Sequence, residues 1–141
     1  MSTEIGFTID QMEVGMSRSY AKTLTETDIV LFAAASGDVN SVHLNQEYAE
    51  KTPFGGRIAH GILTAGVISA CIANKLPGAG TIYLGQTLKF KAPVRPGDTV
   101  TATVTVKSLD AEKNRVVLDT ICQVAGKTVL EGEATVLAPK A

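Results

Sequence analysis

The residues of this chain best suited to chemistry are Asp38 and His43, which lie five positions apart in the short, turn-rich stretch 36–43. The chain has only two histidines, and the second begins the dipeptide His60-Gly61, at the start of a long apolar segment. Histidine ordinarily titrates near roughly pH 6.5, so a usable fraction is neutral base at pH 7. A carboxylate and a neutral imidazole can therefore hold and polarise one water molecule.

Each of these residues has a plainer interpretation when it is taken alone. An aspartate after a helix and a glycine, as Asp38 follows Gly37, is usually a turn or cap residue. A single histidine is more often packed or solvent-facing than catalytic. The catalytic interpretation depends on the two residues occurring together, in the motif described below.

Composition and charge favour a single globular domain over residues 1–141. Hydrophobic residues make up 45% of the chain and charged residues only 19%, which is enough for a sizeable core. The formal net charge of −1 gives no reason to expect nucleic acid or an acidic membrane as a partner. Cys71 and Cys122 show no CxxC or metal-ligand spacing, so we expect buried free thiols and no metal site.

Targeting signals are not evident in the sequence. The first six residues lack the basic and apolar regions of a signal peptide. The most apolar run, Ile58–Ala73, is interrupted by polar residues and is shorter than the ~20 residues that span a bilayer. We therefore expect a cytoplasmic protein with no membrane segment.

Local patterns predict a strand and two helices ahead of the apolar segment. These are a strand over Ser17–Thr23, a helix capped by Thr25 and ended by Gly37, and a short helix over Gln46–Lys51 capped by Asn45. Asp38 therefore falls just beyond the end of a helix.

The second half of the chain changes from a helical to a two-residue period. Residues 58–76 are apolar nearly all round, as in a helix buried on most sides, and Pro77-Gly78 closes them. Strands are expected over 81–91 with a bulge at Gly85, 100–107, 116–124 and 128–137, the last two joined by the hairpin turn 125–127.

Long consecutive strands with short turns predict an antiparallel sheet, and the apolar helix is the element available to cover it. The expected architecture is a hotdog, an α+β fold in which the sheet curls around the central helix. A single curled sheet leaves exposed edges and an incompletely covered helix. Pairing with a second copy would relieve both, so we expect a homodimer.

Three stretches in the middle of the chain match one known family in order. They are Phe32-Ala33-Ala34-Ala35-Ser36-Gly37-Asp38-Val39-Asn40-Ser41-Val42-His43, Phe54-Gly55-Gly56-Arg57-Ile58-Ala59-His60-Gly61-Ile62-Leu63, and Ile82-Tyr83-Leu84-Gly85-Gln86-Thr87-Leu88-Lys89-Phe90 with its ending Pro93-Val94-Arg95-Pro96-Gly97-Asp98. Through these residues the chain resembles the MaoC-like (R)-specific enoyl-CoA hydratases, including the short bacterial enzymes that feed polyhydroxyalkanoate synthesis. The first stretch is specific for the hydratases, whereas the third mainly reports the fold.

The resemblance implies a catalytic pair, Asp38 and His43, that adds water to an enoyl-CoA thioester. It implies that the backbone N–H of Gly61 binds the thioester oxygen and that Ser69 lies near the active site. It implies no metal or redox cofactor, and CoA enters only as part of the substrate. The family usually has proline where this chain has Ser41, which leaves the rigidity of the loop open.

Further residues have supporting roles in this interpretation. Asn40 is expected to brace the catalytic loop, and His60 to fix the loop before Gly61. The acyl tail would contact Ile68, Ile72 and Leu31. The basic residues Arg57, Lys89, Lys91 and Arg95 could meet the CoA phosphates, although each alone is more simply a solvated surface charge. Ser69 could equally bond a backbone carbonyl of its own helix.

Three other functions remain open at this stage. A hotdog acyl-CoA thioesterase commonly has an acidic residue on or beside the central helix, and Ile62–Lys75 contains none. A 3-hydroxyacyl-carrier-protein dehydratase of the fatty-acid cycle usually has a helix glutamate, which is also missing. A non-catalytic hotdog subunit is disfavoured by the intact Asp38 and His43. Acyl-chain length and pathway stay open.

Overall fold

The computed structural model describes residues 4–141, so Met1–Thr3 of the predicted domain 1–141 lie outside the described residues. Its elements are η1 (Ile9–Gln11), β1 (Ser17–Thr23), α1 (Glu26–Ser36), α2 (Ser41–Leu44), α3 (Gln46–Glu50), α4 (Gly61–Asn74), β2 (Ile82–Gln86), β3 (Lys89–Phe90), β4 (Thr99–Asp110), β5 (Arg115–Val124) and β6 (Lys127–Leu137). No helix of this described part is long and apolar enough to cross a membrane.

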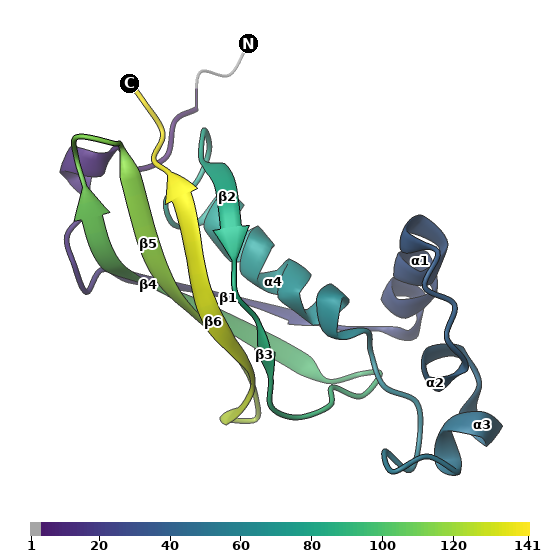
Figure 1. Cartoon of the computed structure of the whole chain (residues 1–141). Coiled ribbons are helices and arrows are strands. Elements are labelled where there is room, and N and C mark those ends of the chain that lie inside the picture. The colour runs from purple at the N-terminus through teal and green to yellow at the C-terminus, as the bar shows by residue number, and fades with distance from the viewer. Residues whose placement is uncertain (1–3) are drawn as a thin grey trace.

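The strands form one antiparallel sheet in the order β1-β4-β5-β6-β2, and β3 also pairs with β6. Helix α4 lies across one face of this sheet and packs mainly on β4, β1 and β5 (Figure 1). Helices α1 to α3 lie together beyond one end of α4 (Figure 1). The arrangement confirms the predicted α+β hotdog fold.

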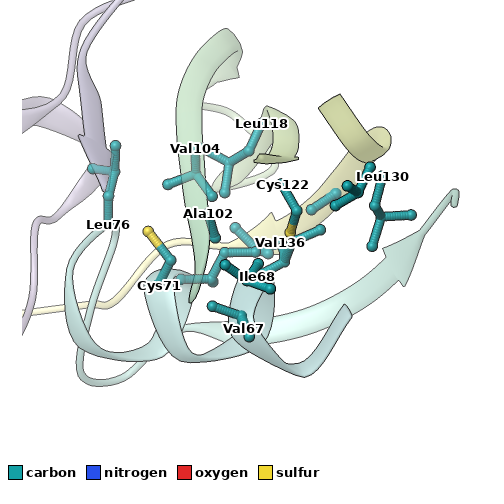
Figure 2. Close-up of a cluster of buried hydrophobic side chains, with 14 of the residues drawn as sticks. Val67, Ile68, Cys71, Leu76, Ala102, Val104, Leu118, Cys122, Leu130 and Val136 are labelled. Carbon is teal, nitrogen blue, oxygen red and sulfur yellow. The ribbon is translucent and has the colours of Figure 1, made fainter. Parts of the chain in front are cut away.

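The core lies between α4 and the sheet. Alternate residues of β4 point toward the helix and are 0–1% exposed: Val100, Ala102, Val104 and Val106. Figure 2 shows Ala102 and Val104 on the side of the sheet that faces Ile68 and Cys71 of α4, and the same core cluster includes Val67, Val100 and Val106. This confirms the two-residue period. Burying each valine or isoleucine of this core contributes ~1.5–3 kcal/mol, so the core holds α4 against the sheet.

Helix α4 begins at Gly61, and the prediction that it extends from Ile58 was wrong. The two residues before His60 lie outside any helix or strand, because their N–H groups bond elsewhere. The N–H of Ile58 donates to Val42 O at 3.2 Å and that of Ala59 to Val94 O at 2.7 Å. These bonds attach the approach to α4 both to α2 and to the segment after β3. The first helical residue is therefore held in place from two sides.

The stretch 81–91 is two short strands, and the prediction of one strand there was wrong. The bulge is confirmed, because the register with β6 shifts between Tyr83 and Gly85. The chain leaves the ladder at Thr87, whose N–H bonds Glu133 O at 2.8 Å and whose Oγ1 accepts the N–H of Glu133 at 2.9 Å. Strand β3 then returns to β6, with Phe90 opposite Leu130.

The predicted helix caps are confirmed. Thr25 Oγ1 accepts the N–H of Asp28 at 3.1 Å, and the Asp28 carboxylate accepts the N–H of Thr25 at 2.9 Å. This backbone bond, with Lys22 nearby, lowers the pKa of Asp28. Gly37 ends α1 with φ 81°, and Asn45 caps α3 through a bond from Tyr48 N at 3.1 Å. Helix α3 ends at Glu50, one residue earlier than predicted.

Candidate active site

Asp38 lies directly after the left-handed glycine that ends α1. Its N–H donates to Ser36 Oγ at 3.1 Å, and its Oδ1 accepts the N–H of Asn40 at 3.3 Å. The carboxylate is exposed and is not paired with any cation among the described residues. The turn thus presents, at the end of α1, an exposed carboxylate whose one hydrogen bond within the described residues is from the N–H of Asn40.

His43 lies on α2, a one-turn helix that the sequence patterns did not predict. Asn40 caps this helix, because its Oδ1 accepts the N–H of Val42 at 3.0 Å. His43 is 8% exposed, and its Nδ1 lies 2.8 Å from Ile58 O. Since a carbonyl only accepts, Nδ1 carries the hydrogen in the neutral ring and Nε2 carries the lone pair.

His60 connects the surroundings of both candidate catalytic side chains. Its Nε2 donates to the main-chain oxygen of Asp38 at 2.9 Å. Its ring stacks on that of His43 and is tilted against Phe32, with ring centroids 3.8 and 4.7 Å apart respectively. His60 is 2% exposed, and its Nδ1 is buried without a hydrogen-bond partner among the described residues.

One donor atom from each of Asp38, His43 and His60 lies within 4.8 Å of the others, a spacing that could suggest a metal ion. The geometry of the rings opposes this. A metal binds an imidazole nitrogen in the plane of the ring at about 2.0–2.1 Å, and these two rings are stacked with planes only 26° apart. One ion cannot lie in both planes at that distance. The donors suit a hydrogen-bonded water better.

Gly61 is the first residue of α4. As the first helical residue it has no acceptor for its N–H within α4, and no other described residue accepts this N–H. The donor is therefore open at the positive end of the helix dipole. A Cβ at this position would lie 2.5 Å from Cε1 of Phe90. The absence of a side chain at Gly61 therefore allows the aromatic ring to pack directly against the helix start.

A pocket of about 490 Å³ opens beside Gly61. Its walls come from the segment before α4, the first turn of α4, the segment from β3 onward, and β6. The lining residues are Phe54, Ile58, Ala59, Gly61, Ile62, Thr64, Phe90, Lys91, Ala92, Pro93, Val94, Val129 and Leu130. All but Lys91 are uncharged and most are apolar, so the pocket suits an organic chain with a charge at its outer end.

Two arginines hold the segment that leads into α4. The guanidinium of Arg95 donates to Phe54 O, to Gly56 O at 3.1 Å and to Arg57 O at 3.5 Å. Arg57 forms a two-point ion pair with Glu26 of α1, with Nη2 to Oε2 at 2.7 Å. The bond to Glu26 raises the pKa of Arg57 and lowers that of Glu26.

The structure does not gather at this pocket the three predicted acyl-tail residues, Ile68, Ile72 and Leu31, or Ser69, which was predicted to lie near the active site. Ile68 and Ile72 are 0% and 1% exposed in the core, Leu31 is 61% exposed on α1, and Ser69 is exposed on α4. None of the four lines the pocket beside Gly61. Their role in binding the substrate stays a prediction.

Sequence reasoning missed two contributors to the site. Ile58 acts through its carbonyl oxygen, which a residue type cannot reveal. Phe90 falls within the third family stretch, but the expected single strand over 81–91 concealed its contact with Gly61.

Comparison with known proteins gives consistent matches over most of the chain. The MaoC-like domain family matches residues 10–132. An (R)-specific enoyl-CoA hydratase of Rhodospirillum rubrum is 58% identical over 130 residues, 92% of this chain and 90% of the relative. A 3-hydroxybutyryl-CoA dehydratase of Methylorubrum extorquens is 47% identical over 131 residues, covering 93% and 83%. The unliganded R-hydratase PhaJ1 of Pseudomonas aeruginosa superimposes with a TM-score of 0.91 at 47% identity, covering 96% of this chain and 88% of that one.

Proposed function

The chain belongs to the MaoC-like domain family, and on that premise we propose that it is an (R)-specific enoyl-CoA hydratase. It adds water reversibly to trans-2-enoyl-CoA and forms (R)-3-hydroxyacyl-CoA. The observation that best supports this activity is the bond from His43 Nδ1 to Ile58 O, which leaves the Nε2 lone pair available. A nitrogen of this ring lies within 4.8 Å of an Asp38 carboxylate oxygen. The stereochemistry follows the similar hydratases named above.

The catalytic pair holds the attacking water. The two hydrogens of this water point to the Asp38 carboxylate and to Nε2 of His43. A lone pair of the water oxygen therefore faces C3 of the enoyl group. As the C3–O bond forms, the pair takes one proton from the water and returns a proton to C2. Because coupled groups share their protons, the pair acts as one acid–base unit.

The third catalytic group is the N–H of Gly61. Attack at C3 moves negative charge onto the thioester oxygen, and this N–H donates to that oxygen. The open helix start adds the favourable field of its dipole. Donors of this kind typically contribute about 10²–10³ in rate.

We propose that the reaction needs no metal or redox cofactor, with CoA present only as part of the substrate. The stacked His43 and His60 rings support this, since they cannot share one ion in both ring planes. Full activity after dialysis against EDTA is the expected result, and a loss that zinc restores would contradict it.

We further propose that the enzyme is a homodimer and acts in the cytoplasm. Among residues 4–141, strand β2 ends the sheet and its outer edge is unpaired. Its Ile82 and Leu84 are exposed, as is Ile62 on α4. A second copy would cover these apolar side chains and pair the edge. Leu84→Arg should shift the mass in light scattering from dimer to monomer, whereas Val14→Arg, at an exposed position outside this patch, should not.

The deciding experiment is hydration of crotonyl-CoA, followed by the loss of the enoyl-thioester ultraviolet absorbance. We expect rapid loss with the wild type, almost none with Asp38→Asn, and normal rates with Asp119→Asn, which removes an exposed carboxylate on β5. A dehydrogenase specific for one 3-hydroxyacyl enantiomer then identifies the product. Turnover of crotonyl thioesters only on acyl carrier protein would favour the carrier-protein dehydratase. A protein inactive on every enoyl thioester would favour the non-catalytic subunit. Hydrolysis of the thioester bond in place of hydration would favour the thioesterase.

A further inference from the structure

We propose that the ion pair between Arg57 and Glu26 sets the orientation of helix α1 toward the start of α4, and that Arg57 is thereby a positioning residue of the catalytic site. This inference rests on the proposed function, because the groups that it positions are those that hydrate the enoyl thioester. It goes further by giving a part in the reaction to two residues outside the proposed catalytic set.

The proposed catalytic groups come from two separate segments. Asp38 follows the last turn of α1, and His43 lies on α2, a few residues further on. The N–H of Gly61 belongs to the start of α4 and directly follows the entry segment, residues 54–60. One substrate has to meet the Asp38 carboxylate and this N–H at the same time, and a misplacement of about 1 Å can cost about 100-fold in rate. The angle between α1 and the entry segment therefore affects the rate.

The entry segment is bonded firmly to the sheet side of the molecule. The guanidinium of Arg95 donates to Gly56 O at 3.1 Å and to Arg57 O at 3.5 Å. The N–H of Ala59 donates to Val94 O at 2.7 Å. Val94 and Arg95 lie between β3 and β4, so these bonds anchor the segment to the chain that enters the sheet. The main chain of Arg57 is thus a fixed point from which its side chain acts.

Helix α1 is held less firmly than the entry segment. Only Ile29 and Ala33 of this helix are buried, whereas Val30 and Leu31 are 51% and 61% exposed. Figure 1 shows that α1 lies beyond the end of α4. Since most of the stability of a helix in a protein comes from packing of its buried face, a helix with so small a buried face can change its angle at low cost.

The pair with Arg57 fixes this angle at the first turn of α1. Glu26 is the first residue of the helix, and its two carboxylate oxygens accept one bond each from Nη1 and Nη2 of Arg57, the latter at 2.7 Å. Such a fork fixes direction as well as distance. Just past the other end of the helix, His60 of the entry segment donates to Asp38 O at 2.9 Å. The entry segment thus holds α1 at both ends, and two attachments fix an angle that one would leave free.

Stability alone does not account for Arg57. Its Nε is buried without a hydrogen-bond partner among residues 4–141, and a donor left in that state costs free energy. Its partner Glu26 is 57% exposed, and so exposed a pair adds little net stability. Removing the pair should therefore leave the free energy of unfolding almost unchanged, and a lower rate would come from the position of α1.

The test is a double-mutant cycle on the hydration of crotonyl-CoA, with Arg57→Gln, Glu26→Gln and the double variant. We expect each single variant to lower kcat about tenfold, because the angle of α1 is then free to change. The double variant should lose no more than either single variant, because the two residues act as one unit. KM should stay within about twofold of the wild type, since neither residue lines the pocket beside Gly61.

Two further measurements separate positioning from a merely structural effect. Arg57→Lys keeps the charge but loses the two-point fork, so its kcat should lie between those of the wild type and Arg57→Gln. Glu26→Gln changes an exposed side chain and should keep the urea midpoint of the wild type, so its lower kcat is then not due to unfolding.

Lys22→Gln is the matched control. Lys22 of β1 forms an ion pair at 3.1 Å with Asp28, which lies in the same first turn of α1 as Glu26. That pair joins α1 to the strand directly before it and not to the entry segment. We therefore expect kcat and KM of the wild type.

A wild-type kcat in Arg57→Gln, additive losses in the double variant, or an equal loss in Lys22→Gln would overturn the positioning role. So would Arg57→Lys being no more active than Arg57→Gln. These results differ from a failure of the proposed function, in which the wild type itself hydrates no enoyl thioester.

Discussion

The imidazole rings of His43 and His60 stack at 3.8 Å between centroids, with their planes 26° apart. His60 also donates to the main-chain oxygen of Asp38 and immediately precedes Gly61, whose N–H is open. One buried ring therefore contacts or adjoins all three groups of the proposed catalytic site. This makes His60 a positioning residue, because it acts through its neighbours.

Replacing His60 should lower turnover more than substrate binding. His60→Leu removes both the bond to Asp38 and the stacked aromatic face, and a displacement of about 1 Å at a reacting group can cost about 100-fold in rate. His60→Gln retains an N–H donor and should recover part of kcat. Steady-state kinetics on crotonyl-CoA with matched thermal unfolding would check this. Equal kcat for the two variants, or a change in KM alone, would argue against a positioning role.

Adding a methyl group at Gly61 should disturb the site through Phe90. The Cβ of Gly61→Ala would lie 2.5 Å from the ring, so the ring must move away from the helix start. We expect a loss of kcat/KM of at least tenfold, given the cost of misplacing a catalytic donor. The same clash should lower the free energy of unfolding of Gly61→Ala in urea. Adding Phe90→Leu to that variant should recover part of this loss. If the double variant is no more stable than Gly61→Ala alone, the contact with Phe90 is not the cause.

Gly132 should tolerate no side chain. A Cβ there would overlap the carbonyl oxygen of Thr87, a backbone atom fixed by the Thr87 N–H bond to Glu133. Overpacking of this kind typically costs about 1–3 kcal/mol, so Gly132→Ala should lower the free energy of unfolding by about that amount. Gly85→Ala, at a strand glycine with open space around it, is the matched control. Similar urea midpoints for the two variants would refute the prediction.

The two thiols should be unreactive in the native protein. Burial raises the pKa of Cys71, and it raises the pKa of Cys122 to about 12. A raised native pKa stabilises the fold at pH values below the ordinary thiol pKa, and this contribution is lost as the pH rises toward the native value. We expect no reaction with Ellman's reagent at pH 8 until the chain unfolds, when both thiols react. Rapid labelling of either in the native state would contradict this.

Unfolding free energies should show the same linkage. Between the ordinary thiol value of 9.0 and about 12, stability should fall with rising pH. The variant Cys71→Ala/Cys122→Ala should fall less steeply over that range in urea titrations, measured against its own stability at pH 7. Identical slopes in both proteins would exclude the thiols as a cause.

The elements that the sequence predicted well depend on neighbouring residues. Thr25 and Asp28 form a reciprocal cap within one turn, and Ala125-Gly126 makes a hairpin turn with φ of 49° and 79°. Strand β4 alternates because one of its faces covers the core. Such patterns act over a few positions and can be identified from the order of residues alone.

The errors of prediction arose where distant segments compete for the same backbone. Bonds to Val42 and Val94 hold Ile58 and Ala59 outside helix α4 in spite of their apolar, helix-compatible pattern. The bonds between Thr87 and Glu133 interrupt the strand after β2. None of these three partners is near in sequence to the residue that it bonds, so no local pattern reveals the bonds.

The sequence by itself determined the types of the chemical groups, a carboxylate at Asp38, imidazoles at His43 and His60 and an open position at Gly61, together with the fold that contains them. Only the tertiary structure decided how these groups present their donors and acceptors. Ile58 O selects the nitrogen of His43 that keeps its lone pair, and Phe90 meets Gly61 from another strand. The physical reason is that hydrogen-bond direction and close contact depend on atoms brought together from distant parts of the chain.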